Sequence, residues 1–261
     1  ADLGGFPHRL RLSAPEYERE TDERGERLRF AVSVQDVNEA DDYMADEPPL
    51  TGTVTVTLRD DEPLVDLDYE IETNCNVEVR SLRGPWLRVG ADSFGADRDD
   101  AIFPGIDWVE GSEHSSGTDW FEHPEARRVT PHPHKVSIPV MAVSNDGTGV
   151  GLSWNPDSVE LSPMPHVRCP QPVFASPNFV DSRDDNLLGL MLPSVRWGLE
   201  EGELEADSPV DVRGGSTFSL DATVSVVDGN SLDVVSDWVQ REGLPEPTDP
   251  RYEWDDAIEW L

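Results

Sequence analysis

The stretch GTVTVTLRDDEPLVDLDYEIET, residues 52–73, decides the fold class of this chain. In its first half apolar residues alternate with threonines, and in its second half apolar residues return at every other position up to Ile71. Successive side chains of a β-strand point to opposite faces of a sheet, so this alternation is typical of half-buried strands. The acidic, proline-containing residues 60–63 between the two halves predict a turn. The whole stretch therefore predicts an antiparallel β-hairpin.

The same alternation recurs along most of the chain. It predicts further strands at residues 27–37, 76–80, 85–89, 136–143, 150–154, 187–192, 209–213 and 217–227. In the last of these strands, the apolar face is expected to run from Phe218 to Val226. The sequence therefore predicts an all-β protein, a large antiparallel β-sandwich or supersandwich that occupies residues 1–230.

Two long stretches interrupt the strand pattern. Residues 90–133 and residues 155–177 are rich in Gly, Pro and polar side chains, and we expect both to be irregular. Loops this long are uncommon in compact domains unless they carry a function. The glycine-rich residues 147–151 lie between two predicted strands, with no helix after them to receive a phosphate, so they predict a hairpin turn.

Helix is predicted only at the end of the chain. Residues 232–242 are expected to form a helix that Ser231 caps and Gly243 ends. A second amphipathic stretch starts at Pro250. We assign residues 231–261 to a linker helix and the start of a helical segment, whose bare apolar face must be buried. It either docks on the β-domain or, as we favour, belongs to a C-terminal helical domain of the same chain.

The charge of the chain is strongly negative. Its 54 acidic and 20 basic residues give a net charge of −34, and Lys135 is the single lysine. This charge disfavours nucleic acid and anionic membranes as partners, and no apolar run is long enough to cross a bilayer. With 8 Trp and 8 Phe the chain is no acidic disordered protein. We expect a soluble, salt-adapted protein with an acidic surface, in a high-salt environment where ions screen its self-repulsion.

Residues 103–134 are the most concentrated candidate for a ligand site. Sugars bind through aromatic faces that cover their C–H groups and through charged side chains that take their hydroxyls. The candidate carbohydrate-binding residues are Trp108, Glu110, Trp120, Glu122, His123, Arg127, His132 and His134. The alternative is a structural loop whose aromatic residues plug one end of the sandwich.

Catalytic and metal-binding signatures are weak. Glu110, Asp119 and Glu122 supply carboxylates for a glycosidase pair, but a chain this acidic offers such residues everywhere. His132 and His134 would face the same side of an extended strand, yet the spacing matches no specific metal motif. Cys75 and Cys169 either form one disulfide or remain two buried thiols. We expect no metal and no cofactor.

Three segments resemble a known family. FPGIDWVEG (residues 103–111), HPHKVSIPVMAV (residues 132–143) and GLSWNP (residues 151–156) are similar to the N-terminal β-supersandwich, or galactose-mutarotase-like, domain of six-hairpin glycoside hydrolases. In those enzymes an (α/α)6 barrel follows the β-domain. The order predicted here, many strands and then helix, resembles that arrangement. The catalytic acid and base of that family usually lie on the barrel.

The resemblance implies a carbohydrate-binding or substrate-shaping domain of a larger glycoside hydrolase, without turnover of its own. Two alternatives stay open. The first is a self-contained mutarotase-like epimerase or polysaccharide lyase that uses His123, His132 and Glu122 as acid and base. The second is a structural or interaction domain without a ligand.

Overall fold

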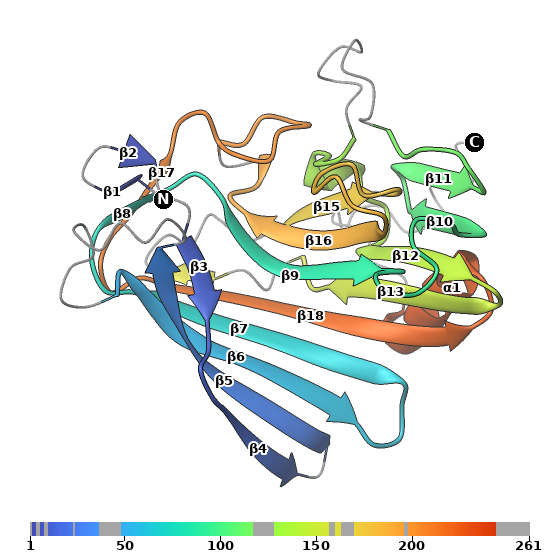
Figure 1. The fold of residues 1–261 in the computed structure, drawn as a ribbon, viewed down its shortest axis with the longest axis horizontal. Coiled ribbons are helices and arrows are strands. Elements are labelled where there is room, and N and C mark those ends of the chain that lie inside the picture. The colour runs from blue at the N-terminus through green and yellow to red at the C-terminus, as the bar shows by residue number, and fades with distance from the viewer. Residues whose placement is uncertain are drawn as a thin grey trace, which may run out of the picture.

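A computed structural model describes residues 2–3, 6–7, 10–22, 24–36, 48–116, 128–156, 160–162, 170–195 and 198–243. Within these ranges the chain folds into antiparallel β-sheets with one α-helix after the last strand (Figure 1). The all-β class predicted from the alternating pattern is confirmed. No helix in the described part of the chain is long and apolar enough to span a bilayer.

The largest sheet has eleven strands. Its order is β11 (Asp107–Glu110), β10 (Asp100–Phe103), β12 (Val140–Asn145), β13 (Thr148–Trp154), β18 (Thr217–Asp228), β7 (Leu64–Thr73), β6 (Leu50–Arg59), β5 (Gly25–Asp36) and β3 (Leu10–Ser13). In addition, β14 (Glu160–Ser162) pairs with β18, and β4 (Tyr17–Asp22) pairs with β5. The predicted hairpin over residues 52–73 is confirmed as β6 and β7, with Val54 opposite Tyr69.

Two smaller sheets complete the β-structure. A three-stranded sheet has the order β15 (Gln171–Ala175), β16 (Asn186–Leu192) and β9 (Leu82–Val89). A four-stranded sheet has the order β17 (Val210–Val212), β8 (Val77–Val79), β1 (Asp2–Leu3) and β2 (Phe6–Pro7). The three-stranded sheet is drawn above β13 and β18 in Figure 1. The two sheets form the predicted sandwich.

The main core fills the space between the large sheet and the three-stranded sheet. Met141 and Leu152 of the large sheet and Phe174 and Leu188 of the small sheet belong to one fully buried cluster. The ring of Phe103 lies 5.7 Å from that of Phe174, centroid to centroid. Burial of each such side chain contributes about 1.5–3 kcal/mol to folding, so this interface supplies much of the stability of the fold.

The helix α1 (Ser231–Glu242) covers the opposite face of the large sheet. Its Val234 and Trp238 pack against Val140 and other apolar residues of β10 and β12. Gly151 makes room for the helix, because a Cβ atom there would lie 2.4 Å from Val234 Cγ1. The glycine-rich segment thus does more than the predicted hairpin turn. Gly147 forms that turn, and the later glycines let the helix approach.

The start of α1 differs by one residue from the prediction. The N-cap is Asn230, whose side-chain oxygen accepts hydrogen bonds from the backbone amides of Leu232 at 2.9 Å and Asp233 at 3.1 Å. Asp233 Oδ2 accepts in return from the Asn230 amide, which completes a capping box. Ser231 as N-cap is therefore wrong, whereas Gly243 as the C-cap is confirmed. The amphipathic stretch from Pro250 lies outside the described residues.

Several strands lie where the sequence predicted loops. Strands β10 and β11 form a hairpin inside residues 90–133, and β15 lies inside residues 155–177. The five residues of β15 are all buried, so it shows no alternation of polar and apolar residues. The strand predicted at residues 136–143 begins only at Val140 and follows a 3-10 turn at Pro133–Lys135.

The far end of β18 also departs from prediction. Phe218, Leu220 and Ala222 are buried as expected, but Val226 on the same face is 44 % exposed. Beside it, Val227 on the other face packs against the cluster beneath α1. The helix therefore covers the opposite side of the sheet at this point. Cys75 is a half-buried free thiol, and Cys169 lies outside the described residues.

Candidate functional site

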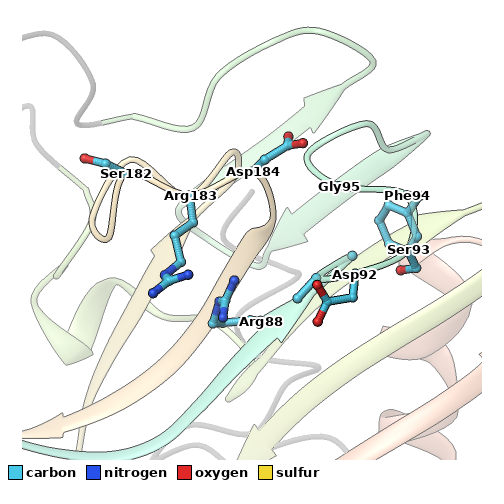
Figure 2. A pocket seen from close by; sticks show the side chains of 10 residues that line it. Arg88, Asp92, Ser93, Phe94, Gly95, Ser182, Arg183 and Asp184 are labelled. Atoms are coloured by element: carbon cyan, nitrogen blue, oxygen red, sulfur yellow. The ribbon is translucent and has the colours of Figure 1, made fainter.

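A polar cavity of about 550 Å³ lies at one end of the three-stranded sheet. Its walls are the turn after β9 and the loop that leads into β16 (Figure 2). The lining residues are Arg88, Gly90, Ala91, Asp92, Ser93, Phe94, Gly95, Ser182, Arg183 and Asp184. Guanidinium, carboxylate and hydroxyl groups thus surround one partly buried aromatic ring. This composition suits a ligand that both donates and accepts hydrogen bonds.

The first wall is a tight glycine turn. The carbonyl oxygen of Gly90 accepts hydrogen bonds from the amides of Ser93 at 3.0 Å and Gly95 at 2.9 Å. Both glycines have positive φ values, +92° and +69°, which other residues rarely adopt. A Cβ atom on Gly90 would lie 2.0 Å from the Gly95 carbonyl oxygen, so only glycine fits. The sequence therefore fixes the shape of this wall.

The second wall is a loop built around Asn178, which is itself buried. The Asn178 amide donates to the Asp185 carbonyl at 2.7 Å, and the Arg183 amide donates to the Asn178 carbonyl at 3.1 Å. The two walls are also joined directly. The amide of Ala96 donates to Asp184 Oδ1 at 3.0 Å, and Asn186 Nδ2 donates to the Gly95 carbonyl at 3.3 Å. The cavity is therefore held open by hydrogen bonds within and between its walls.

Backbone strain concentrates at this cavity. Among the described residues, three non-glycine residues have positive φ, and two of them, Asp92 (φ 59°) and Ser182 (φ 53°), line the cavity. Each such conformation costs about 1 kcal/mol or more and persists only where the surrounding structure holds it. The third, Asp146, belongs to a hairpin turn. Strained residues that face one cavity are typical of ligand sites.

Arg88 is anchored from below the cavity. Its Nε donates to Asp185 Oδ2 at 2.7 Å, and Asp185 is completely buried. Asn178 Nδ2 donates to the other carboxylate oxygen of Asp185 at 2.7 Å. The Arg88 side chain is still 37 % exposed. The guanidinium is thus held in place on one side while its other side faces the cavity.

Arg183 approaches Arg88 from the opposite wall. Figure 2 shows the two guanidinium groups pointing toward each other. No hydrogen bond or ion pair joins the Arg183 side chain to another residue of the described ranges. The carboxylate of Asp184 points away from this pair, toward residues 95–96. Among the residues that the structure describes, the cavity therefore has one positive charge without an ionic partner beside one that is anchored.

A second aromatic residue, Trp86, lies two residues before Arg88 on β9 and therefore on the same face of that strand as Arg88. The Arg83 guanidinium carbon lies 4.3 Å above the Trp86 ring, and Trp86 Nε1 donates to Asp181 Oδ2 at 2.8 Å. Burial opposes the charge of Asp181, but the hydrogen bond from Trp86 and the nearby Arg83 outweigh it and lower the pKa of this carboxyl. Asp181 is therefore an anionic support of the loop that forms the second wall.

The residues predicted from sequence lie elsewhere. Trp108 and Glu110 share one exposed face of β11, with Trp108 55 % exposed. The rings of His132 and His134 stack 4.8 Å apart, and His132 Nδ1 accepts from the His134 amide at 3.2 Å. None of these four lines the cavity. Trp120, Glu122, His123 and Arg127 lie outside the described residues.

The 3-10 turn explains why the two histidines stack. The predicted extended strand would have placed both rings on one side of a strand, whereas the turn folds one over the other. Lys135 at its end pairs with Glu201 at 2.8 Å. No group of three or more His, Cys, Asp or Glu side chains in the described ranges is arranged to hold a metal ion.

Sequence reasoning missed the cavity because its residues are far apart in the chain. Arg88 and Asp185 are separated by 97 positions, and neither stands in a recognisable motif. The one available signal was the polar run SRDDN at residues 182–186, directly before a strongly apolar strand. Such a run predicts a turn, but it does not show which strand end the turn will face.

Comparison with known proteins finds likeness only among solved structures. No family model and no curated protein matches the chain. The α-N-acetylgalactosaminidase NagBb from Bifidobacterium bifidum, in complex with GalNAc, is similar over 87 % of this chain and 30 % of its own, with 10 % identity and a TM-score of 0.47. This chain therefore spans less than a third of that enzyme.

Two further structures show the same level of likeness. A putative aldose 1-epimerase from Klebsiella pneumoniae is similar over 91 % of this chain and 61 % of its own, with 10 % identity and a TM-score of 0.44. The GH36 α-galactosidase AgaA from Geobacillus stearothermophilus is similar over 86 % of this chain and 29 % of its own, with 12 % identity and a TM-score of 0.42. At this level of likeness, the function of the cavity has to be inferred from its own residues.

Proposed function

We propose that this chain is a carbohydrate-binding β-sandwich domain and that its cavity holds a sugar. The supporting observation is the anchored Arg88 guanidinium, which faces a polar cavity beside the Phe94 ring. A sugar presents hydroxyl groups that both donate and accept hydrogen bonds, together with C–H groups that suit an aromatic surface. Arginine donates, carboxylates accept and serine does both, so the lining matches each of these needs.

The cavity is also arranged before a ligand arrives. Arg88 is fixed by Asp185, and the two walls are tied together through Asp184 and Asn186. Binding then needs little ordering of side chains, and this lowers its entropic cost. Serine hydroxyls from both walls, Ser93 and Ser182, can adjust to the hydroxyls of the sugar.

Calorimetric titration with a panel of mono- and oligosaccharides in molar KCl tests this proposal. We expect one or more sugars to bind, and Arg183→Ala to weaken the binding of at least one of them about tenfold, as expected for the loss of a hydrogen bond from a charged group. Arg213→Ala, an exposed arginine outside the cavity, is the matched control and should bind as the wild type does. Absence of binding by every sugar of the panel would refute the proposal.

We further propose that the domain belongs to a larger glycoside hydrolase, in which it shapes the substrate site and a helical domain follows residues 231–261. The capped helix α1 after the last strand supports this order. Exposed Trp108 and Glu110, with His132 and His134, would then form a second contact surface for carbohydrate or for that domain. In a longer enzyme, replacing Trp108 by Ala should raise KM and leave the thermal stability unchanged.

We also propose that the acidic surface adapts the protein to concentrated salt. The net charge of −34 supports this, because the screening length falls to about 3 Å at 1 M salt. The midpoint of thermal unfolding should therefore rise steeply between dilute buffer and about 2–3 M KCl. At roughly that concentration the repulsion between surface charges is fully screened. A midpoint that falls as KCl is added would contradict salt adaptation.

A further inference from the structure

The most informative feature of the cavity is the pair of guanidinium groups in its lining, within a chain that is strongly acidic. Some surface arginines are neutralised locally, as Arg59 is by Asp66 at 2.8 Å and Arg19 is by Glu26 at 2.6 Å. Arg183 has no such partner in the described structure, although it stands within a cavity beside a second guanidinium. Two like charges that face each other repel, and an anion between them removes that repulsion.

The lining holds two arginines and two aspartates and so has no net charge, but the two guanidinium groups point toward each other and favour an anion of single charge between them. Buried Asp185 neutralises Arg88, so the pair of arginines carries one uncompensated positive charge. Asp184 is turned toward the Ala96 amide and does not face the pair. Asp92 lines the cavity but forms no ion pair with Arg88 or Arg183 in the described structure. A monoanion satisfies the arginines, whereas a dianion would exceed their charge and approach Asp92.

We propose that the cavity selects an acidic sugar, a uronic acid whose carboxylate lies between Arg183 and the exposed side of Arg88. This inference rests on the proposed carbohydrate-binding function. A planar carboxylate matches the fork of a guanidinium and accepts two parallel hydrogen bonds from it. The hydroxyls of the sugar ring donate to Asp92 and to the serine hydroxyls, and Asp92 turns the carboxylate of the ligand toward Arg183 by repulsion.

Titration with four monosaccharides tests the selection. D-glucuronate and D-galacturonate are compared with D-glucose and D-galactose by calorimetry at several KCl concentrations. We expect the uronates to bind at least about tenfold more tightly than the neutral sugars, with the difference shrinking as salt increases. Equal affinity for the charged and neutral sugars would overturn the selection while leaving carbohydrate binding intact. Binding of neither class would overturn the selection as well, and the panel that includes oligosaccharides then decides whether the proposed function stands.

Variants of the two charged lining residues identify the carboxylate partner. Arg183→Ala should weaken uronate binding about tenfold and change neutral-sugar binding by less than about twofold, and Arg183→Lys should restore part of the loss. Asp92→Asn should strengthen uronate binding because it removes a repulsive carboxylate. An equal loss for both classes of sugar in Arg183→Ala would contradict the assignment. Unchanged circular dichroism and unfolding midpoints verify that each variant is folded.

Competition with simple anions separates a uronate site from a general anion site. Acetate presents the same carboxylate without the sugar ring and should compete weakly with uronate. Inorganic phosphate and sulfate, which are mainly dianions at neutral pH, should compete no better than acetate. If phosphate displaces the uronate more effectively than acetate does, the cavity is a phosphate site and the assignment to uronic acids is wrong.

Discussion

The large sheet has a covered half and an open half, and they differ in burial. In the covered half, the three-stranded sheet lies on one face and α1 on the other, and five of the six residues of β12 are buried, as are all residues of β15 and β16 in the covering sheet. In the open half, every residue of β4 is exposed, and β6 is buried only near its ends. The cavity lies at the rim of the covered half. A densely packed region therefore positions the site, and the open half extends the sheet.

Core truncation should show the largest contrast between the two halves. Phe174→Ala in the covered half removes a ring from a fully buried cluster, and we expect it to lower the free energy of unfolding by about 3–5 kcal/mol. Val54→Ala on half-buried β6 should cost about 1 kcal/mol. Denaturant titration in molar KCl measures both. Equal costs would show that the open half is packed as tightly as the covered half.

The anchor beneath the cavity should show the next largest effect. Asp185→Ala leaves the Arg88 guanidinium and Asn178 Nδ2 without their partner. We expect the free energy of unfolding to fall by about 2–3 kcal/mol. This is less than for a fully buried ion pair, because Arg88 is partly exposed. Asp181→Ala, which breaks the more exposed pair with Arg83, is the control and should cost about 1 kcal/mol. A smaller loss for Asp185 than for Asp181 would show that the cavity does not depend on its anchor.

The glycines beneath α1 should show a smaller, steric effect. Gly151→Ala places a methyl group against Val234, and we expect it to lower the free energy of unfolding by about 1–2 kcal/mol. The double variant Gly151→Ala with Val234→Ala should be less destabilised than the sum of its single variants, because truncated Val234 leaves space for the new methyl group. Strict additivity in denaturant titration would show that the helix does not rest on Gly151.

The polar face of the open half should show the smallest effect. Burial and the nearby Asp68 raise the pKa of Asp221 above its usual value, and the two residues stand opposite each other on β18 and β7. The folded state therefore binds more protons than the unfolded state just above pH 4, and stability falls as pH rises through this window. Asp221→Asn should stabilise the protein at pH 7 by a few tenths of a kcal/mol, because the side chain is only partly buried and solvent screens the interaction.

The gain from Asp221→Asn should shrink as the pH falls through this window and disappear near about pH 3, where the wild-type carboxyl is protonated in both the folded and the unfolded state. Unfolding midpoints of the variant and the wild type at about pH 7 and about pH 3 provide the measurement. Asp211→Asn, at an exposed position on β17, is the control and should have no comparable effect. Destabilisation by Asp221→Asn at pH 7 would contradict the raised pKa.

The contrast between the two halves also explains which elements could be predicted from sequence. Alternation identified β6, β7 and most of β18, because each has one polar and one apolar face. It failed for β15, because burial on both faces removes the alternation. It also failed for the hairpin of β10 and β11, because these strands are too short to show it. The helix was predicted because Gly243 and a 3.6-residue pattern mark it locally.

The candidate site was less predictable than the fold. Trp108 and His132 stood out because aromatic and imidazole groups are concentrated within residues 103–134. Arg88 and Arg183 gave no comparable signal, since their proximity depends on the pairing of β9 with β16, which is not encoded locally. The sequence predicted a ligand of carbohydrate type, and only the three-dimensional arrangement indicates the cavity that could hold it.

Residue-resolved NMR titration of the whole chain with D-galacturonate in molar KCl tests the central claim most directly. If the cavity binds the sugar, amide shifts should be largest at residues 90–95 and 182–184, on the two walls that face each other in Figure 2. Shifts confined to Trp108, Glu110, His132 and His134, with none at the cavity walls, would show that the exposed surface near β11 is the binding site and would contradict the account.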